Sequence, residues 1–113
     1  MTSCPRRRPA KIASQAGWPG WWHYIRADIT LAVDVSRLIE ACVEDRNLDV
    51  ALCHAGMVGS RAILDYSERE WDDIRAPNLR GAFLVAKAAV RSMVDRKTAG
   101  KIFFTSSWVQ DVP

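Results

Sequence analysis

The sequence predicts an α/β fold, in which a parallel β-sheet is covered by helices on both faces. Short apolar runs typical of buried strands alternate with longer segments whose apolar residues recur at helical spacing. The order strand, helix, strand, helix, strand in one chain favours crossover connections and therefore parallel strands. With 113 residues, of which 49% are hydrophobic and 26% charged, the chain is suited to one small globular domain.

The first 22 residues are expected to form a tail, and the domain is expected to span residues 23–113. The tail mixes prolines, glycines and tryptophans without helical or strand periodicity. Residues 1–26 hold five basic residues and no acid, so the remainder of this +3 chain carries a net charge of −2. Such an arm can bind nucleic acid or an anionic membrane, but three arginines beside prolines are more typical of a solvated tail.

No apolar stretch in the sequence reaches the length of a membrane span, and no segment resembles a signal peptide. We therefore expect a cytoplasmic protein with neither a membrane nor a nucleic acid as partner. The three cysteines are odd in number and lack metal-ligand spacing, which favours neither a disulfide framework nor a metal site. Cys42 and Cys53 fall on apolar faces and are expected to be buried.

The first half of the domain is expected to contain a strand, a helix and a second strand. Residues 23–29 alternate enough for a short strand, and Thr30 then serves as a helix N-cap. A helix ending near Asn47 follows, and Asp34 near its start suits the helix dipole. The apolar stripe of this helix consists of Val35, Leu38, Ile39 and Cys42. Residues 49–53 alternate little, as expected for a strand covered on both faces.

The second half is expected to contain two helical segments and a third strand. After a polar loop, Ser67 and Glu70 form a capping box that begins a helix with Trp71 and Ile74 on one face. Pro77 interrupts this helix. The helical pattern resumes after residue 78 and is closed by Gly100, and residues 101–105 then form a buried strand that leads into Ser106 and Ser107.

The resumed helix carries an unusually narrow polar stripe. Its polar residues Arg80, Lys87, Arg91 and Asp95 fall within about 80° of the helical wheel. We therefore expect this helix to be covered on one side by its own sheet and on another by a partner subunit. The prediction is a homo-oligomer, either a dimer or a tetramer, that associates through residues 79–94.

Three strand ends carry groups suited to ligand binding, which in open α/β sheets occurs beyond the carboxyl ends of the strands. These ends are residues 28–30, residues 53–56 and the serine pair 106–107. Asp28 can accept a hydrogen bond from an amino group, a serine can donate to an oxygen, and Gly56 allows close approach to the backbone. Taken singly, a serine after a strand is more often a helix cap, and Ala-Gly is more often a turn.

Four blocks of the sequence together resemble the central part of the short-chain dehydrogenase/reductase family, in its order and spacing. They are DIT at 28–30, LDVALCHAG at 48–56, EWDDIRAPNLRGAFLVAKAA at 70–89 and GKIFFTSS at 100–107. The resemblance covers residues 26–113. It implies a partial Rossmann fold, that is, a doubly wound parallel sheet with flanking helices, truncated at both ends.

The resemblance also implies roles in cofactor binding. Asp28 matches the aspartate that receives the adenine amino group, and Ile29 flanks the adenine ring. The block Cys53-His54-Ala55-Gly56 matches the Asn-Asn-Ala-Gly segment that lines the ribose and stabilises the central strand. Both asparagines are replaced, although His54 keeps a donor and an acceptor. The alternative for His54 is a partly buried histidine in a turn.

Two further residues match the catalytic machinery of the family. Asn78 matches the asparagine at the helix kink, which holds a water in the proton relay. Ser107 matches the serine that hydrogen-bonds the carbonyl or hydroxyl oxygen of the substrate, and Ser106 is the less favoured candidate.

The 113 residues contain neither the Tyr-x-x-x-Lys motif nor the TGxxxGxG turn of this family. The expectation is therefore an internal fragment, inactive alone, of an oxidoreductase that uses NAD or NADP and a small alcohol or carbonyl substrate. The alternative is a non-catalytic α/β module that binds a partner or nucleotide.

Overall fold

The computed structural model describes residues 24–44 and 46–107, so the tail expected at residues 1–22 lies outside the described residues. The helices are α1 (Ala32–Cys42), α2 (Glu68–Arg75) and α3 (Ala82–Asp95). Two shorter helical turns are η1 (Ile63–Asp65) and the π-helical η2 (Ala76–Gly81). The strands are β1 (Val50–Cys53) and β2 (Lys101–Phe104).

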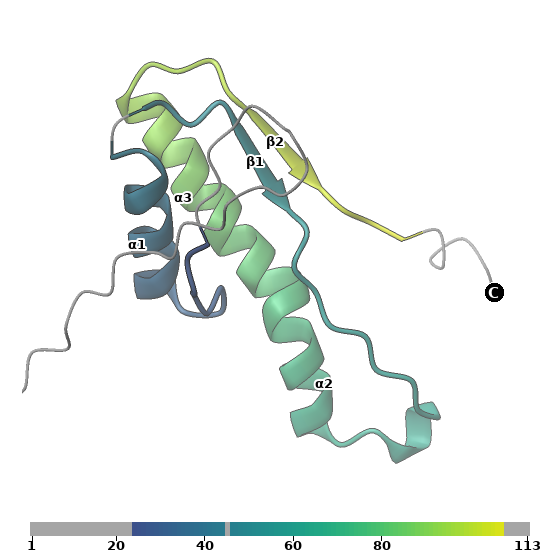
Figure 1. The fold of residues 1–113 in the computed structure, drawn as a ribbon. Helices are drawn as coiled ribbons and strands as arrows, with labels where there is room; N and C mark the ends of the chain where they lie inside the picture. The colour runs from purple at the N-terminus through teal and green to yellow at the C-terminus, as the bar shows by residue number, and fades with distance from the viewer. Residues whose placement is uncertain (1–23, 45, 108–113) are drawn as a thin grey trace, which may run out of the picture.

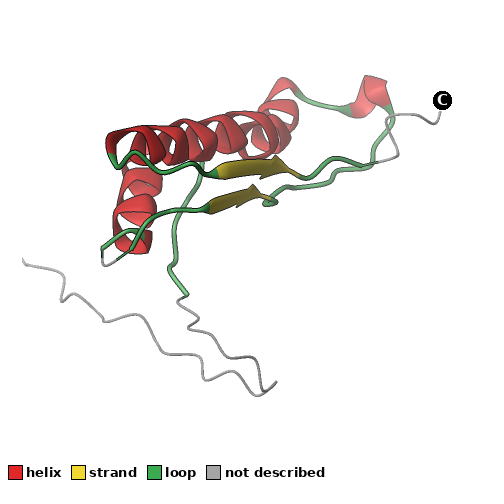
Figure 2. Ribbon diagram, turned by 90° about the horizontal axis from the view of Figure 1, so that it is seen from above, coloured by secondary structure: helices red, strands yellow, loops and turns green. Residues whose placement is uncertain are grey.

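The two strands lie side by side in parallel, as the sequence predicts. Val50 is paired with Lys101 and Cys53 with Phe104. The helical segment that connects them returns over the sheet, and Figure 2 shows α3 lying along the strands. In Figure 1, α1 lies beside α3 on the side away from β2. The α/β class and the parallel arrangement are thus confirmed.

The predicted strand at residues 23–29 is wrong for the described residues 24–29, which form neither a strand nor a helix. A strand exists only where its backbone groups are paired with a neighbouring strand. In the described part of the chain the sheet consists of β1 and β2 alone. The alternating pattern of this segment therefore has no neighbour with which to form a ladder.

The core lies between α1, α3 and one face of the sheet. Val35 and Ala89, which are almost completely buried, lie on the two helices, and Ala51 lies on β1. Ile39 and Met93 complete the cluster one helical turn further on. Of the stripe predicted for α1, Val35 and Ile39 are therefore buried, whereas Leu38 is half-buried and Cys42 is exposed. The small side chain of Ala89 allows close packing at the centre.

The other face of the sheet is open, and the prediction that β1 is covered on both faces is wrong for the described structure. Val50 and Leu52 alternate with the buried Ala51 and are exposed, as is Phe103 next to Leu52. Alternate side chains of a strand point to opposite faces of a sheet. Since α3 packs on one face only, the second set of apolar side chains has no cover among the described residues.

The limits of α1 differ from the prediction at both ends. Leu31, and not Thr30, occupies the N-cap position, because the Thr30 hydroxyl donates to Asp28 instead. The helix ends at Cys42 and not near Asn47, since residues 44–47 offer no apolar side chain that would pack on the core. Cys42 is exposed, which corrects the expectation that it is buried.

Helix α2 begins where the sequence predicts. The backbone N–H of Glu70 donates to the Ser67 hydroxyl over 3.2 Å, and the Glu70 carboxylate accepts from the Ser67 backbone N–H over 3.0 Å. These two hydrogen bonds form the predicted capping box. Trp71 is exposed and Ile74 is half-buried, so their shared face is only partly covered.

Pro77 does not break the helical path. Without an N–H to donate, Pro77 cannot make the α-helical bond to the preceding turn. The chain accommodates the proline by widening into η2, and then continues directly into α3. The α-helix is therefore interrupted as predicted, but by a π-helical turn within one continuous helical segment (Figure 1).

The predicted closure of the helix by Gly100 is wrong, because Lys97 performs this role. Lys97 has a φ of 55°. The N–H of Thr98 donates to the carbonyl of Met93 over 2.8 Å, and the N–H of Lys97 to that of Val94 over 3.1 Å. This is a Schellman motif with lysine at the left-handed position. Gly100 instead provides space, since a Cβ there would lie 2.5 Å from the Met93 Cε atom.

A second face of α3 is apolar and exposed. Phe83, Val90 and Val94 fall within about 40° of the helical wheel at 100° per residue, and Leu79 precedes them by one turn. All four are exposed in the chain by itself. In the part of the chain that the structure describes, no helix is long and apolar enough to cross a membrane.

Candidate functional site

The candidate site is built around the carboxyl ends of β1 and β2. The pairing of Cys53 with Phe104 continues for one more residue, because the N–H of Thr105 donates to the carbonyl of Cys53 over 3.1 Å. His54 and Thr105 therefore leave the sheet next to each other. Beyond them run the two loops that carry Gly56 and the serine pair.

A side-chain hydrogen bond joins these two strand ends. The Nδ1 atom of His54 lies 2.9 Å from the hydroxyl oxygen of Thr105. His54 is exposed in the described structure. Thr105 was not singled out from the sequence, because its place across from His54 depends on the register of the two strands, which pairs Cys53 with Phe104.

Asn78 binds the loop that follows β1. Its Oδ1 atom accepts from the backbone N–H of Met57 over 2.6 Å, and its Nδ2 atom donates to the carbonyl of the same residue over 2.7 Å. The amide thus pairs with Met57 as a neighbouring strand would. Gly56 lies so close that a Cβ there would be 3.0 Å from the Asn78 Oδ1 atom. The sequence assigned both residues to the site, and the structure brings them together.

The π-helical turn η2 explains why the Asn78 side chain can reach Met57. A π-helical turn contains one more residue than an α-helical turn over the same length, so it bulges and changes the direction of its side chains. Asn78 lies within this turn, directly after Pro77. The proline that disrupts the α-helix and the asparagine that holds the loop therefore act in the same local structure.

The turn at Asp28 forms a second part of the candidate site. The Oδ1 atom of Asp28 accepts from the Thr30 hydroxyl over 2.7 Å and from the Thr30 backbone N–H over 2.9 Å. These two hydrogen bonds, the first above all, lower the pKa of Asp28 from its ordinary value. Asp28 is therefore a carboxylate at neutral pH, and its Oδ2 atom remains an acceptor for a ligand.

A hollow with a volume of about 560 Å³ lies beside this carboxylate. Its lining consists of Arg26, Ala27, Asp28, Ile29 and Asp34. The Asp34 carboxylate also accepts from the backbone N–H of Asp28 over 3.0 Å, which fixes the turn to the start of α1. The hollow therefore combines acidic acceptors, one guanidinium and the apolar side chain of Ile29.

The Asp28 turn is attached to η2 by two contacts. Ile29 packs on Gly81 so closely that a Cβ on the glycine would lie 2.7 Å from the Ile29 Cδ1 atom. Arg80 donates a hydrogen bond to the carbonyl of Thr30. Arg80 was expected only on the polar stripe of the helix, and no sequence pattern indicated its longer-range bond to Thr30. The η2 turn therefore connects the Asp28 turn with the loop that follows β1.

Cys53 is unsuited to nucleophilic chemistry. Its thiol lies 3.8 Å from the carbonyl oxygen of Ala82 and is half-buried. Burial raises the pKa of Cys53 above its ordinary value, so the thiol stays protonated at neutral pH. Cys53 thus acts as a packing residue between β1 and the start of α3.

Ser106 and Ser107 are exposed and follow β2 at the same edge of the sheet as His54. Because Thr105 is bonded to both Cys53 and His54, the first residue of this loop is fixed to β1. Among residues 24–44 and 46–107, no group of three or more His, Cys, Asp or Glu side chains could hold a metal ion.

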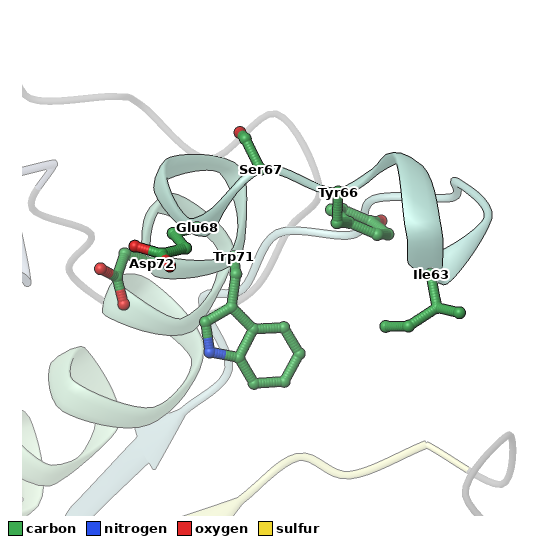
Figure 3. A pocket seen from close by; sticks show the side chains of 6 residues that line it. All are labelled: Ile63, Tyr66, Ser67, Glu68, Trp71 and Asp72. Atoms are coloured by element: carbon green, nitrogen blue, oxygen red, sulfur yellow. The ribbon is translucent and has the colours of Figure 1, made fainter.

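Another hollow, of about 400 Å³, lies at the start of α2, away from the predicted site residues (Figure 3). It is lined by Ile63, Tyr66, Ser67, Glu68, Trp71 and Asp72. Figure 3 shows the Trp71 and Ile63 side chains extending to the same side, from α2 and η1 respectively, whereas Ser67 points the other way. This hollow was not predicted from the sequence, because it forms where a segment without periodicity, which carries Ile63 and Tyr66, passes next to the start of α2.

Comparison with known proteins supports the resemblance of the four sequence blocks. Residues 5–113 match the family model described as short chain dehydrogenase. A short-chain dehydrogenase/reductase of Armillaria gallica is 36% identical over 80 residues, which cover 70% of this chain and 31% of that protein. The (3R)-3-hydroxyacyl-CoA dehydrogenase of Canis lupus familiaris is 38% identical over 98 residues, covering 83% of this chain and 38% of that enzyme.

Solved structures agree with the fold. A short-chain type dehydrogenase/reductase from Mycobacterium marinum has a TM-score of 0.75 at 35% identity, covering 78% of this chain and 36% of that one. An NAD⁺-bound xylitol dehydrogenase has a TM-score of 0.69 at 27% identity, with 76% of this chain and 34% of that one covered. The chain thus spans about a third of the length of these relatives.

Proposed function

Because the chain belongs to the short-chain dehydrogenase family, we propose that it forms the central section of an NAD(P)-dependent oxidoreductase domain. The reaction is hydride transfer between the cofactor and an alcohol or carbonyl group of a small-molecule substrate. The observation that carries this proposal is the convergence on η2. Asn78 binds the loop after β1, and Gly81 contacts the Asp28 turn.

The residues present suit the adenosine half of such a cofactor. The Asp28 carboxylate is ionised and would accept a hydrogen bond from the adenine amino group, beside the apolar side chain of Ile29. The segment from Cys53 to Gly56 would line the ribose, with Ala55 and Gly56 allowing close approach. This assignment applies equally to NAD and NADP.

The residues near the strand ends suit the substrate half of the reaction. The cofactor supplies the hydride-carrying group. The Ser107 hydroxyl would donate a hydrogen bond to the reacting oxygen and orient the substrate. Both polar atoms of the Asn78 amide are bound to Met57, so Asn78 would shape the η2 turn and leave backbone groups of that turn to hold a water.

Binding by the chain itself provides the test. Titration of NADH, and separately of NADPH, into the ¹⁵N-labelled chain should shift the amide signals of residues 28–30 and 54–56. Asp28→Ala should abolish the shifts at residues 28–30, whereas the control Asp95→Ala, on the far end of α3, should preserve them. Shifts confined to other regions, or equal loss in both variants, would contradict the assignment.

We further propose that these 113 residues do not catalyse turnover alone. Proton transfer to or from the substrate oxygen requires a group of suitable pKa. The two tyrosines, Tyr24 and Tyr66, are followed four residues later by Asp28 and Glu70, and not by a lysine. Oxidation of NADH or NADPH by the purified chain at an ordinary enzymatic rate would refute this expectation.

The exposed apolar face of α3 is proposed as the self-association surface of the complete enzyme. Leu79 and Phe83 line a hollow of about 600 Å³ beside Arg75 and Arg80, and the Lys87 ammonium lies 5.8 Å from the centre of the Phe83 ring. This surface also supports the alternative of a non-catalytic interaction module. A defined oligomer without NADH- or NADPH-induced shifts would favour that alternative.

A further inference from the structure

We propose that His54 positions the serine pair 106–107 by holding Thr105 through its Nδ1 atom. The proposal extends the proposed function, because it treats Ser107 as the residue that meets the substrate. It rests on the 2.9 Å separation between the His54 Nδ1 atom and the Thr105 hydroxyl oxygen. No role in substrate or cofactor contact is assigned to Thr105.

The hydrogen bond between His54 and Thr105 lies where it can restrict the positions of Ser106 and Ser107. The backbone bond from Thr105 to Cys53, 3.1 Å long, joins the two chain segments one residue beyond the paired residues Cys53 and Phe104. A second attachment at Thr105 restricts rotation of its backbone about this bond, and thereby the start of the segment that carries Ser106. The His54 ring provides that attachment on the side chain, so Thr105 is held both by its N–H and by its hydroxyl.

The loop after β1 is fixed at both of its ends. His54 at its start is bonded to Thr105, and Met57 at its end is bonded twice to Asn78. Residues 54–57 therefore form a short bridge between η2 and the end of β2. A displacement at either end would be transmitted to the serine pair through this bridge.

The ring nitrogen involved determines which substitutions should preserve the bridge. The Nδ1 atom of histidine is separated from Cα by the same number of bonds as the side-chain amide atoms of asparagine. Asparagine at position 54 can therefore reach the Thr105 hydroxyl, which both donates and accepts hydrogen bonds. Leucine has nearly the shape of asparagine and lacks the polar atoms.

The experiment measures backbone order in the ¹⁵N-labelled full chain by NMR relaxation. His54→Leu and Thr105→Val should each lower the amide order parameters of Ser106 and Ser107 to below about 0.6, a value typical of flexible backbone. His54→Asn and Thr105→Ser should restore the wild-type order parameters. The order parameters of the Ala51 and Leu52 amides within β1 should be unchanged in all four variants. Unchanged values there show that the sheet is intact.

Three outcomes would overturn the proposal. They are unchanged serine order in His54→Leu, equal loss in His54→Asn and His54→Leu, and loss in Thr105→Val that Thr105→Ser does not reverse. The double variant His54→Leu/Thr105→Val should lose no more order than either single variant. Titration of NADH into the same samples separates the two hypotheses: absence of binding by wild type counts against the proposed function and leaves the order measurement valid.

Discussion

At the scale of single residues, the site depends on side chains that hydrogen-bond the backbone of a neighbouring segment. Asn78 satisfies both polar groups of Met57, and Thr30 donates twice to Asp28. Such bonds hold an exposed loop in one conformation without requiring burial. They therefore allow a surface loop to present a ligand group in a defined position.

The Asp28 turn should respond to loss of the Thr30 hydroxyl. The hydroxyl bond is the main cause of the lowered pKa of Asp28, so Thr30→Val should raise this pKa toward the ordinary value. ¹³C NMR titration of the Asp28 carboxyl provides the measurement. The pKa of Glu70, which is lowered chiefly by the hydrogen bonds from Ser67, should stay low in the variant and serves as the control.

The sign of the accompanying stability change follows from the direction of the pKa shift. A carboxyl group with a lowered pKa in the folded state stabilises the protein above its unfolded pKa, and this contribution is lost as the pH falls through the folded value. Thr30→Val should therefore destabilise the chain at neutral pH by more than at pH values below the folded pKa of Asp28. A stability difference that is independent of pH would show that the Asp28 charge is not involved.

At the scale of elements, the polar ends and turns of the helices determine how the chain connects its packed segments. The Ser67 capping box begins α2, η2 joins α2 to α3, and Lys97 ends the continuous segment. The capping box and the Lys97 turn change the direction of the chain, whereas η2 changes the direction of the side chains within a continuous helical segment. Together they place the carboxyl ends of β1 and β2 at the same edge of the sheet.

Replacing the left-handed Lys97 with glycine should stabilise the chain. A side chain at positive φ costs about 1–2 kcal/mol, and the greater freedom of glycine in the unfolded chain offsets about 0.5–1 kcal/mol of the gain. Lys97→Gly should therefore raise the free energy of unfolding, as measured by urea denaturation. The control Arg96→Gly, at a residue with a φ of −95°, should lower it. Stabilisation by both variants would contradict the Schellman assignment.

The elements also show which features could be predicted from sequence. Apolar spacing predicted the buried Val35 and Ile39 of α1, and the Ser67-Glu70 pair predicted the start of α2, because both patterns depend on neighbouring residues. The predicted strand at residues 23–29 was wrong for the described residues 24–29, and the predicted closure of the helix by Gly100 was also wrong. Whether a strand forms depends on a distant partner. Lys97 adopts a conformation usually given to glycine, because two backbone hydrogen bonds compensate for its cost.

The residues of the candidate site also fall into two groups, those assigned from the sequence and those that were missed. Asp28, Gly56, Asn78 and Ser107 were assigned from short sequence blocks, and the positions of the first three in bonded or packed turns agree with site roles, which remain proposals. Thr105 and the Arg80 bond to Thr30 were missed. These depend on the strand register and on the packing of η2, which are set by the whole fold.

At the scale of the whole molecule, the sheet is the least protected part of the described structure. Its two strands present Val50, Leu52 and Phe103 on the face opposite α3. Parallel sheets in α/β proteins are usually buried on both faces, and open strand edges invite further pairing. The chain spans about a third of the length of its relatives.

The open face should cause self-association of the isolated chain. Leu52 is 61% exposed and Phe103 is 50% exposed, and they are neighbours across the strands. The double variant Leu52→Thr/Phe103→Thr should therefore shift the sedimentation profile toward monomer. Val58 is 97% exposed but lies in the loop outside the sheet, so Val58→Thr should leave the profile unchanged. An equal effect of both changes would point to nonspecific apolar contacts.

We propose that these residues supply the adenine-binding turn and the substrate serine of a hydride-transferring domain. This proposal is tested by replacing, in the canine (3R)-3-hydroxyacyl-CoA dehydrogenase, the segment that aligns with residues 26–107 by these residues and measuring steady-state kinetics with that enzyme's hydroxyacyl-CoA substrate. The folded chimera should be active. Ser107→Ala should lower kcat by about 10²- to 10³-fold, and Asp28→Ala should raise the cofactor KM by roughly tenfold. A folded, cofactor-binding chimera whose kcat is unaffected by Ser107→Ala would contradict the claim.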